Sequence, residues 1–243
     1  MKPLANPRCL VLLACAAALG CMAPPGKPGP STGTPRPEQV LDFPTLYAQN
    51  CAACHGANGK NGAAISLNNP VYLAIAGSAN IQRITADGVP GTAMPPFTRA
   101  KGGMLTEHQI AALATGMEQT WVNPTSLAGQ TAPAYANSTP GDPAQGQKAF
   151  AAYCAQCHGA DATGMKSATG VVTGSLIEPA YLALIGDQGL RSILLAGQTE
   201  QGAHDWRSYS STHALTSQEA ADIVAWLASH RIDTPGQVYR QHP

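Results

Sequence analysis

The sequence predicts an all-α fold made of two similar domains in tandem. Two observations lead to this prediction. Segment 48–62 resembles segment 151–165, at an offset of 103 residues, and repetition at so long a period indicates two globular copies rather than a solenoid. Thr106 and Thr216 each begin a Thr-x-x-Gln/Glu capping box that precedes apolar residues at helical spacing. Both copies therefore end in a clear amphipathic helix.

The helices are expected in the same order in each copy. The first leads into a cysteine motif. The second begins at a proline, which is favoured at the first helical position. The third is a short amphipathic stretch, and the last follows the capping box. In the order of the chain, we expect helices at 46–54, 70–76, 81–87 and after Thr106, then at 145–157, 179–185, 190–196 and after Thr216. The apolar face of the last helix comprises Ile110, Leu113, Ala114 and Met117 in the first copy, and Ile223, Trp226 and Leu227 in the second.

The segments outside the two copies indicate export and flexible connection. Residues 1–20 contain a basic start and an apolar run of signal-peptide length. The sequence Ala18-Leu19-Gly20-Cys21 resembles a bacterial lipoprotein box, in which Cys21 is lipidated; simple cleavage and release is the alternative. The expected organisation is a signal peptide 1–20, a Pro/Gly-rich tether 21–39, domain one 40–122, a linker 123–141, domain two 142–232 and a tail 233–243.

The composition excludes two classes of protein. Lys and Arg number 14, equal to Asp and Glu, so the chain is not a basic nucleic-acid-binding protein. No apolar run reaches about 18 residues beyond the first few dozen positions, which excludes a multi-pass membrane protein. Only 5% of the residues are aromatic and 12% are charged. So few large side chains suggest that something else fills the two cores.

Four cysteines carry the strongest motif. Cys9 and Cys15 lie in the signal, which leaves Cys51-Ala-Ala-Cys54-His55 and Cys154-Ala-Gln-Cys157-His158 besides Cys21. C-x-x-C-H is the attachment pattern of c-type haem. Two thiols on one helical turn can form thioethers to the haem vinyl groups, and the adjacent histidine can bind the iron. Redox disulfides would not need the histidine twice, and a zinc site would not need pairs so far apart. We therefore predict two covalently attached haem c groups, with His55 and His158 as proximal ligands.

These motifs resemble those of a known family. C-x-x-C-H-G comes early, Met94-Pro95 stands in the middle, and Leu-Thr-x-x-Gln/Glu opens the last helix. The chain resembles a dihaem protein of the bacterial cytochrome c family with two class I-like domains, over roughly 40–121 and 143–231. The resemblance implies a few helices wrapped around each haem. A proline that often follows the motif in this family is missing, so the acceptor of the proximal imidazole cannot be named.

The resemblance also implies a distal ligand on the loop before the last helix. In the first copy Met94 fits this role. In the second copy, the offset of 110 residues measured from the last helix aligns His204 with Met94, with one extra residue placed between Gly197 and Gly202. His204 is therefore the predicted ligand. His213, Met165 and a five-coordinate iron with an open sixth position are the alternatives.

Electron transfer is the predicted function, because two haems with both axial positions filled leave no place for a substrate. The expected partners are redox proteins, including a membrane respiratory or photosynthetic complex, and the membrane through a lipid anchor on the periplasmic side. No nucleic acid is expected. The alternative is a haem enzyme, a peroxidase or a thiosulfate- or nitrogen-oxide-active protein, with an open site at the second haem. Because thioether ligation raises the potential relative to a second imidazole, the first haem is expected to have the higher potential.

Overall fold

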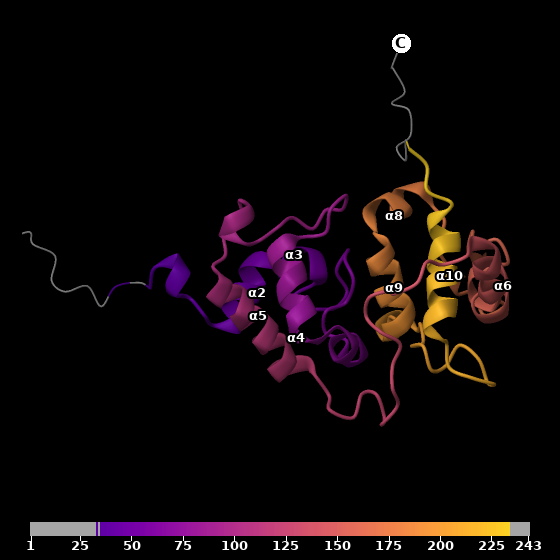
Figure 1. The fold of residues 1–243 in the computed structure, drawn as a ribbon, viewed down its shortest axis with the longest axis horizontal. Coiled ribbons are helices and arrows are strands. Elements are labelled where there is room, and N and C mark those ends of the chain that lie inside the picture. Colours follow the sequence, from indigo (N-terminus) through magenta and orange to yellow (C-terminus); the bar gives the residue numbers. More distant parts are fainter. Residues whose placement is uncertain (1–32, 34, 234–243) are drawn as a thin grey trace, which may run out of the picture. The chain divides into compact units, whose positions relative to one another are not determined.

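The computed structural model describes residue 33 and residues 35–233. The signal segment, Cys21 and most of the tether and tail lie outside these residues. Both copies lie in one compact unit of the chain, which begins at residue 38. The described residues are mostly helical (Figure 1), which confirms the all-α prediction. None of their helices is both long and apolar enough to cross a membrane.

The first copy contains four α-helices. They are α2 (Phe43–Asn50), α3 (Ala52–His55), α4 (Pro70–Asp87) and α5 (Glu107–Trp121), with short 3-10 turns η2 (Pro37–Gln39) and η3 (Arg99–Lys101). Helix α4 merges the second and third predicted helices across Gly77, whose backbone is not helical. Helix α5 packs against both α2 and α4.

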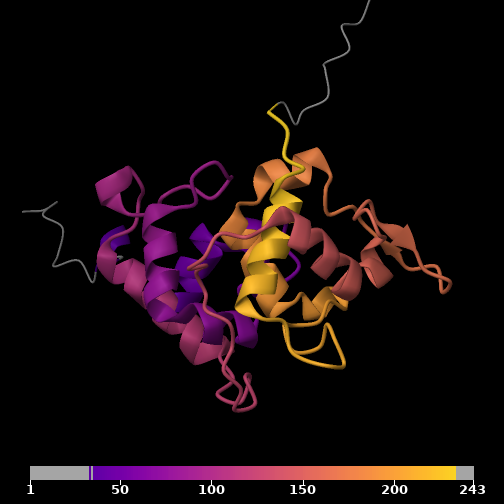
Figure 2. The same cartoon turned by 45° about the vertical axis from the view of Figure 1, so that its right-hand side comes forward.

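The second copy repeats this order. It contains α6 (Pro143–Tyr153), α7 (Ala155–His158), α8 (Pro179–Leu184), α9 (Asp187–Ala196) and α10 (Ser217–Ala228), with the 3-10 turn η4 (Thr199–Gln201). Helix α10, yellow in Figures 1 and 2, packs against α6 and α9. The pairs α2/α5 and α6/α10 therefore occupy corresponding places in the two copies.

One local prediction was wrong, and one element was not predicted. The helix expected to run into each cysteine motif is broken at its first cysteine: Cys51 and Cys154 both have φ near −119°, and a separate short helix follows each. The second copy also contains a small antiparallel hairpin, β1 (Met165–Lys166) with β2 (Val172–Thr173), that helical periodicity did not indicate. It lies in a connection that is longer than its counterpart in the first copy.

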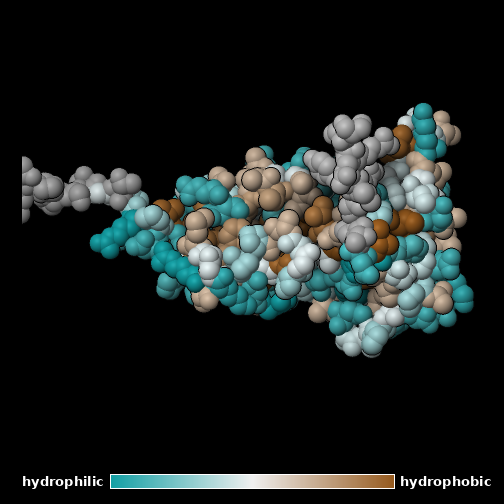
Figure 3. Space-filling model, turned by 90° about the horizontal axis from the view of Figure 1, so that it is seen from above, coloured by the Kyte–Doolittle hydropathy of each residue, from teal (hydrophilic) through white to brown (hydrophobic). Residues whose placement is uncertain are grey.

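The capping boxes and the core faces are as predicted. In both boxes the threonine side chain accepts from the N3 backbone, and the N3 side chain accepts from the threonine backbone. Seven residues named from the helical spacing are buried in the core: Ile110, Leu113, Ala114, Met117, Ile223, Trp226 and Leu227. Burial of Met117 places this methionine in the packing of α5 rather than at a ligand position. Apolar side chains also reach the surface, where Figure 3 shows them in brown among polar residues.

Candidate haem sites and the cytochrome c family

Local backbone geometry places Cys51, the first cysteine of the first motif, at the N-cap of the short helix that carries Cys54 and His55. Helix α2 ends at Cys51, and α3 carries Cys54 and His55 before it ends at Gly56. Gly56 has a φ of +83°, and a Cβ there would lie 1.8 Å from the Lys60 carbonyl oxygen. Only glycine fits this left-handed, crowded position. Gly56 thus turns the chain immediately after the histidine.

The His55 imidazole is buried and oriented by one hydrogen bond. His55 is only 8% exposed. Its Nδ1 lies 2.8 Å from the Ile65 carbonyl oxygen. Burial lowers the pKa of His55, and the carbonyl opposes this effect. The neutral ring with its proton on Nδ1 leaves the Nε2 lone pair for a metal. Ile65 therefore supplies the acceptor that the missing proline left unnamed.

The second motif has the same local fold but a different environment. Helix α7 carries Cys157 and His158 and ends at Gly159. Burial again lowers the pKa of His158, and the Gly174 carbonyl opposes this effect. Nδ1 of His158 is buried, and neither the Gly174 carbonyl nor any other described group makes a hydrogen bond of good geometry with it. The two proximal histidines are thus held differently.

The thiols suit covalent attachment of haem. All four are free of disulfide bonds; Cys51 and Cys154 are half-buried, whereas Cys54 and Cys157 are exposed. Burial, followed by the neighbouring thiol, raises the pKa of Cys51 to about 11 and that of Cys154 to about 12. In the described part of the chain, no three His, Cys, Asp or Glu side chains gather as a metal-binding group. The cysteines therefore lie as two separate pairs.

Met94 lies on a tight loop before the last helix of the first copy. The Val89 amide donates to the Met94 carbonyl oxygen at 3.0 Å, and the methionine is half-buried. Met104, the other methionine near this loop, is 75% exposed. Met94 is thus the residue of this loop that matches the predicted ligand in type and in position. Its coordination to iron stays a prediction.

The corresponding loop of the second copy has a different register from the predicted one. A Cβ on Gly88 would lie 2.6 Å from the Pro95 carbonyl carbon, and one on Gly197 would lie 2.6 Å from that of His204. The carbonyl oxygens of Met94 and Ala203 follow at 2.8 Å in the respective copies. Judged by these contacts, Ala203 takes the place of Met94.

The extra residue of the second copy therefore lies further along the loop. The Leu105 amide donates to the Phe97 carbonyl, eight residues earlier, and the Leu215 amide donates to the Trp206 carbonyl, nine residues earlier. The insertion falls between Trp206 and Leu215, rather than between Gly197 and Gly202. His204 lies one position beyond the methionine place and is exposed. It is still the histidine of this loop nearest to that place in the sequence.

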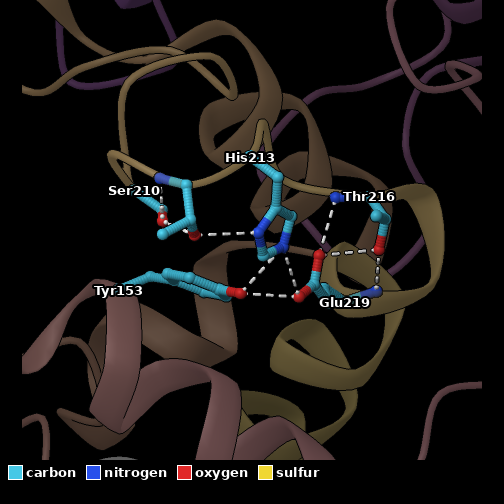
Figure 4. A network of polar contacts seen from close by, with 6 residues as sticks. Tyr153, Ser210, His213, Thr216 and Glu219 are labelled. Carbon is cyan, nitrogen blue, oxygen red and sulfur yellow. Dashed lines mark hydrogen bonds and ion pairs between the residues drawn. The ribbon is translucent and has the colours of Figure 1, made fainter.

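His213 belongs to a polar network. Its Nε2 lies 3.1 Å from the Tyr153 hydroxyl and 3.1 Å from Oε1 of Glu219, and its Nδ1 lies 3.2 Å from the Thr212 hydroxyl. Figure 4 shows the ring between Tyr153 and Glu219. Both ring nitrogens of His213 therefore have polar partners. Met165, the other alternative, lies on strand β1 of the hairpin.

Comparison with known proteins bears on both copies. Residues 38–115 match the family model of cytochrome c oxidase, cbb3-type, subunit III, and residues 143–231 match that of cytochrome c. The chain is a c-type cytochrome with two cytochrome c domains. Each domain of this cytochrome binds a haem c through its C-x-x-C-H motif.

Two curated relatives are similar to the cytochrome. One is the cbb3-type cytochrome c oxidase subunit FixP of Sinorhizobium medicae, 35% identical over 129 residues, or 49% of this chain. The other is the subunit CcoP of Azospirillum sp., 33% identical over 135 residues, or 51% of this chain. The matches span about two fifths of the relatives, 39% and 40% of their lengths. A chain of the reducing HAO-like protein complex of Kuenenia stuttgartiensis aligns with a TM-score of 0.44 at 15% identity, over 82% of this chain and all of that one.

One buried donor without a hydrogen bond, the Trp206 N–H, fits a haem in the second domain of the cytochrome. Three buried side-chain atoms in the described part of the chain lack a hydrogen bond: Nδ1 of His158, Oε2 of Glu200 and Nε1 of Trp206. All three belong to the second copy. A haem carries two propionate carboxylates, which are acceptors for a donor such as the Trp206 N–H. The residues present therefore fit the group.

Sequence reasoning missed the residues that surround the His55 imidazole and its acceptor. Ile65 and Ser66 belong to no recognisable motif in the sequence. The shared Asn/Glu-Pro-x-Tyr-Leu-Ala pattern indicated that Asn69 precedes a helix, but not what its amide contacts. The repeat on either side of segment 62–69 is the sequence signal that indicates a structural role for it.

Proposed function

We propose that the cytochrome carries electrons between redox proteins outside the cytoplasmic membrane. One haem is held by Cys51, Cys54 and His55, with Met94 as its sixth ligand. The other is held by Cys154, Cys157 and His158, with His204 as its sixth ligand. Bound haem iron supplies a one-electron couple. The polypeptide attaches each haem, orders its ligands and excludes water from it.

The observation that carries this proposal is the presence of two complete attachment motifs with a buried histidine in the first. The Ile65 carbonyl and the low pKa of His55 favour the neutral imidazole that binds iron. A carrier needs both axial positions filled, so that electrons move without ligand exchange. Met94 supports this for the first haem. For the second haem, His204 is the proposed ligand because the loop that carries it is the counterpart of the Met94 loop.

The partners are proposed from the printed names of the relatives. Both are described as subunits of cbb3-type cytochrome c oxidases. We infer that the electron acceptor of this cytochrome is a membrane-bound oxidase of that class. The signal segment and a lipid on Cys21 would bring the haem domains to the outer face of the membrane, and the tether 21–39 would give them reach.

Spectroscopy of the oxidised holoprotein tests the proposal. Two low-spin haems in the EPR spectrum, with one methionine–iron charge-transfer band in the absorption spectrum, are the expected result. Met94→Ala should remove that band, and His204→Ala should convert the second haem to high spin. A high-spin component in the unaltered protein that binds cyanide or CO would overturn the carrier proposal and indicate an open site. Retention of two low-spin haems in His204→Ala would overturn His204 as the ligand.

A further inference from the structure

The proximal segment of the first haem site lies against the distal loop of the second. Helices α4 and α9 are in contact. The Asn69 amide, on a residue only 4% exposed, donates to the carbonyl oxygens of Ala196 and Gly197, each at 3.1 Å. Its side-chain oxygen simultaneously caps α4 through Val71 and Tyr72. This residue thus joins the start of α4 to the end of α9.

A second bond joins the same two segments closer to the first haem. The Ser66 hydroxyl, also buried, donates to Oε1 of Glu200 in the turn η4. Ser66 directly follows Ile65, and the Ile65 carbonyl is the group that accepts from His55. Because this carbonyl and the Ser66 nitrogen share one planar peptide, anchoring Ser66 restricts where the carbonyl points.

The second copy does not repeat this arrangement. Ser175 is the counterpart of Ser66, and its hydroxyl donates to the Ala162 carbonyl of its own copy at 3.3 Å. His158 correspondingly has no hydrogen bond at Nδ1. The first haem site alone therefore has its proximal acceptor tied to the other domain.

We propose that Glu200 of the second domain is a positioning residue for the proximal ligand of the first haem. Through Ser66 it holds the Ile65 carbonyl towards Nδ1 of His55. The inference rests on the proposed haem site at His55. A hydrogen bond at Nδ1 raises the basicity of a ligating imidazole, and a more basic imidazole favours iron(III). Loss of the Ser66–Glu200 bond should therefore raise the midpoint potential of the first haem, although Glu200 belongs to the other domain.

Redox titration of the full-length holoprotein tests this with three variants. Glu200→Ala removes the acceptor together with its charge. Ser66→Ala removes the bond without changing the charge. Glu200→Gln removes the charge but keeps an acceptor. Changes in the shell around a metal ligand alter metal affinity tenfold or more. Since Glu200 acts one step further out, we expect about a threefold change in the iron(II)/iron(III) ratio of the first haem at a fixed potential. It should appear in both alanine variants, with the second haem unchanged.

The variants separate positioning from charge and from folding. Glu200→Gln should titrate like the unaltered protein; a shift as large as that of Glu200→Ala would overturn positioning in favour of a charge effect. Thr199→Ala, an exposed change in the same turn, should have no effect. The Ser66→Ala and Glu200→Ala shifts should not add in the double variant, because both break one bond. Additive shifts would also overturn the proposal.

A spectroscopic readout at His55 completes the test. In the reduced protein, the Nδ1 proton resonance of His55 should move upfield in both alanine variants as its hydrogen bond weakens, and should stay in place in Glu200→Gln. An unmoved resonance in Ser66→Ala would overturn the link even if the potential changed. A protein that holds no haem at His55 would instead contradict the proposed function, so the two failures are distinguishable.

Discussion

Glu219 illustrates how a single side chain combines a helix cap with a link between helices. Its Oε2 accepts from the Thr216 amide at 2.8 Å, and its Oε1 accepts from the Tyr153 hydroxyl at 2.7 Å. Burial alone would raise the pKa of Glu219, but the hydrogen bonds from Tyr153, Thr216 and His213 outweigh it and lower the pKa to about 2. The charged form of the Glu219 side chain thus stabilises the folded protein.

This depressed pKa predicts a specific acid dependence. The contribution of Glu219 is fully present above the pKa of an unfolded glutamate, about 4.3, and is lost as the pH falls towards about 2. Glu219→Gln should therefore lower the urea midpoint of the holoprotein at pH 7. The midpoint of this variant should also decrease less than that of the unaltered protein when the pH is lowered from about 4.3 to about 2. Gln109 occupies the same position in the first copy, so the capping box survives. An unchanged slope with pH would contradict the role of Glu219.

Among the elements, the first and last helices of each copy approach closely because one of them carries a glycine at the crossing. In the first copy it is Gly116 of α5, where a Cβ would lie 2.2 Å from the Phe43 ring. In the second copy it is Gly146 of α6, where a Cβ would lie 1.9 Å from the Asp222 carbonyl oxygen. The two copies reach the same helix pairing with the glycine on opposite partners.

Alanine at these glycines should loosen the pairs to different extents. A ring can turn away, whereas a backbone carbonyl cannot. Overpacking costs about 1–3 kcal/mol, and alanine regains up to about 1 kcal/mol as the better helix former. We expect Gly146→Ala to lose about 2 kcal/mol of unfolding free energy, and Gly116→Ala about 1 kcal/mol or less. Urea unfolding of the holoprotein measures both.

Gly174→Ala is the matched control, because a Cβ at Gly174 meets nothing within 4 Å. Its unfolding free energy should stay within about 0.5 kcal/mol of that of the unaltered protein. If Gly146→Ala were as stable as this control, the close approach of α6 and α10 would not depend on the glycine.

At the scale of the whole molecule, the two domains are copies that have diverged around the iron. The first has a hydrogen-bonded proximal histidine and a methionine in its distal loop. The second has a proximal histidine without that bond, an alanine in the methionine place and a loop one residue longer before α10. The scaffold is thus shared, while the groups that set the potential differ.

This divergence predicts two distinct one-electron midpoints in a redox titration of the holoprotein. The first haem should have the higher one, since methionine ligation raises the potential relative to two histidines. Met94→His should lower the upper midpoint by roughly 0.2 V, a fraction of the range of about 0.8 V that axial ligands span, and leave the lower one in place. Two equal midpoints in the unaltered protein would contradict the assignment.

Local patterns were sufficient for much of this protein. The cysteine spacing indicates haem attachment because one helical turn brings two thiols and a histidine together. The capping boxes at Thr106 and Thr216 and the apolar faces that follow them need only residues a few positions apart. The break at Cys51 and the short hairpin were not predicted, because the sequence departs too little from helical periodicity at either place to indicate them.

The sequence by itself indicated the two copies through their repeat, and the helix order and the cofactor through local patterns, because these depend on contacts within a helix or on the chemistry of a short motif. Only the tertiary structure decided which carbonyl accepts from His55, which residue lies in the methionine place of the second copy, and that Glu200 contacts Ser66. These contacts join segments that are distant in the chain. Their geometry follows from how α4 packs on α9 and how each loop closes on its glycine, and no local spacing encodes either.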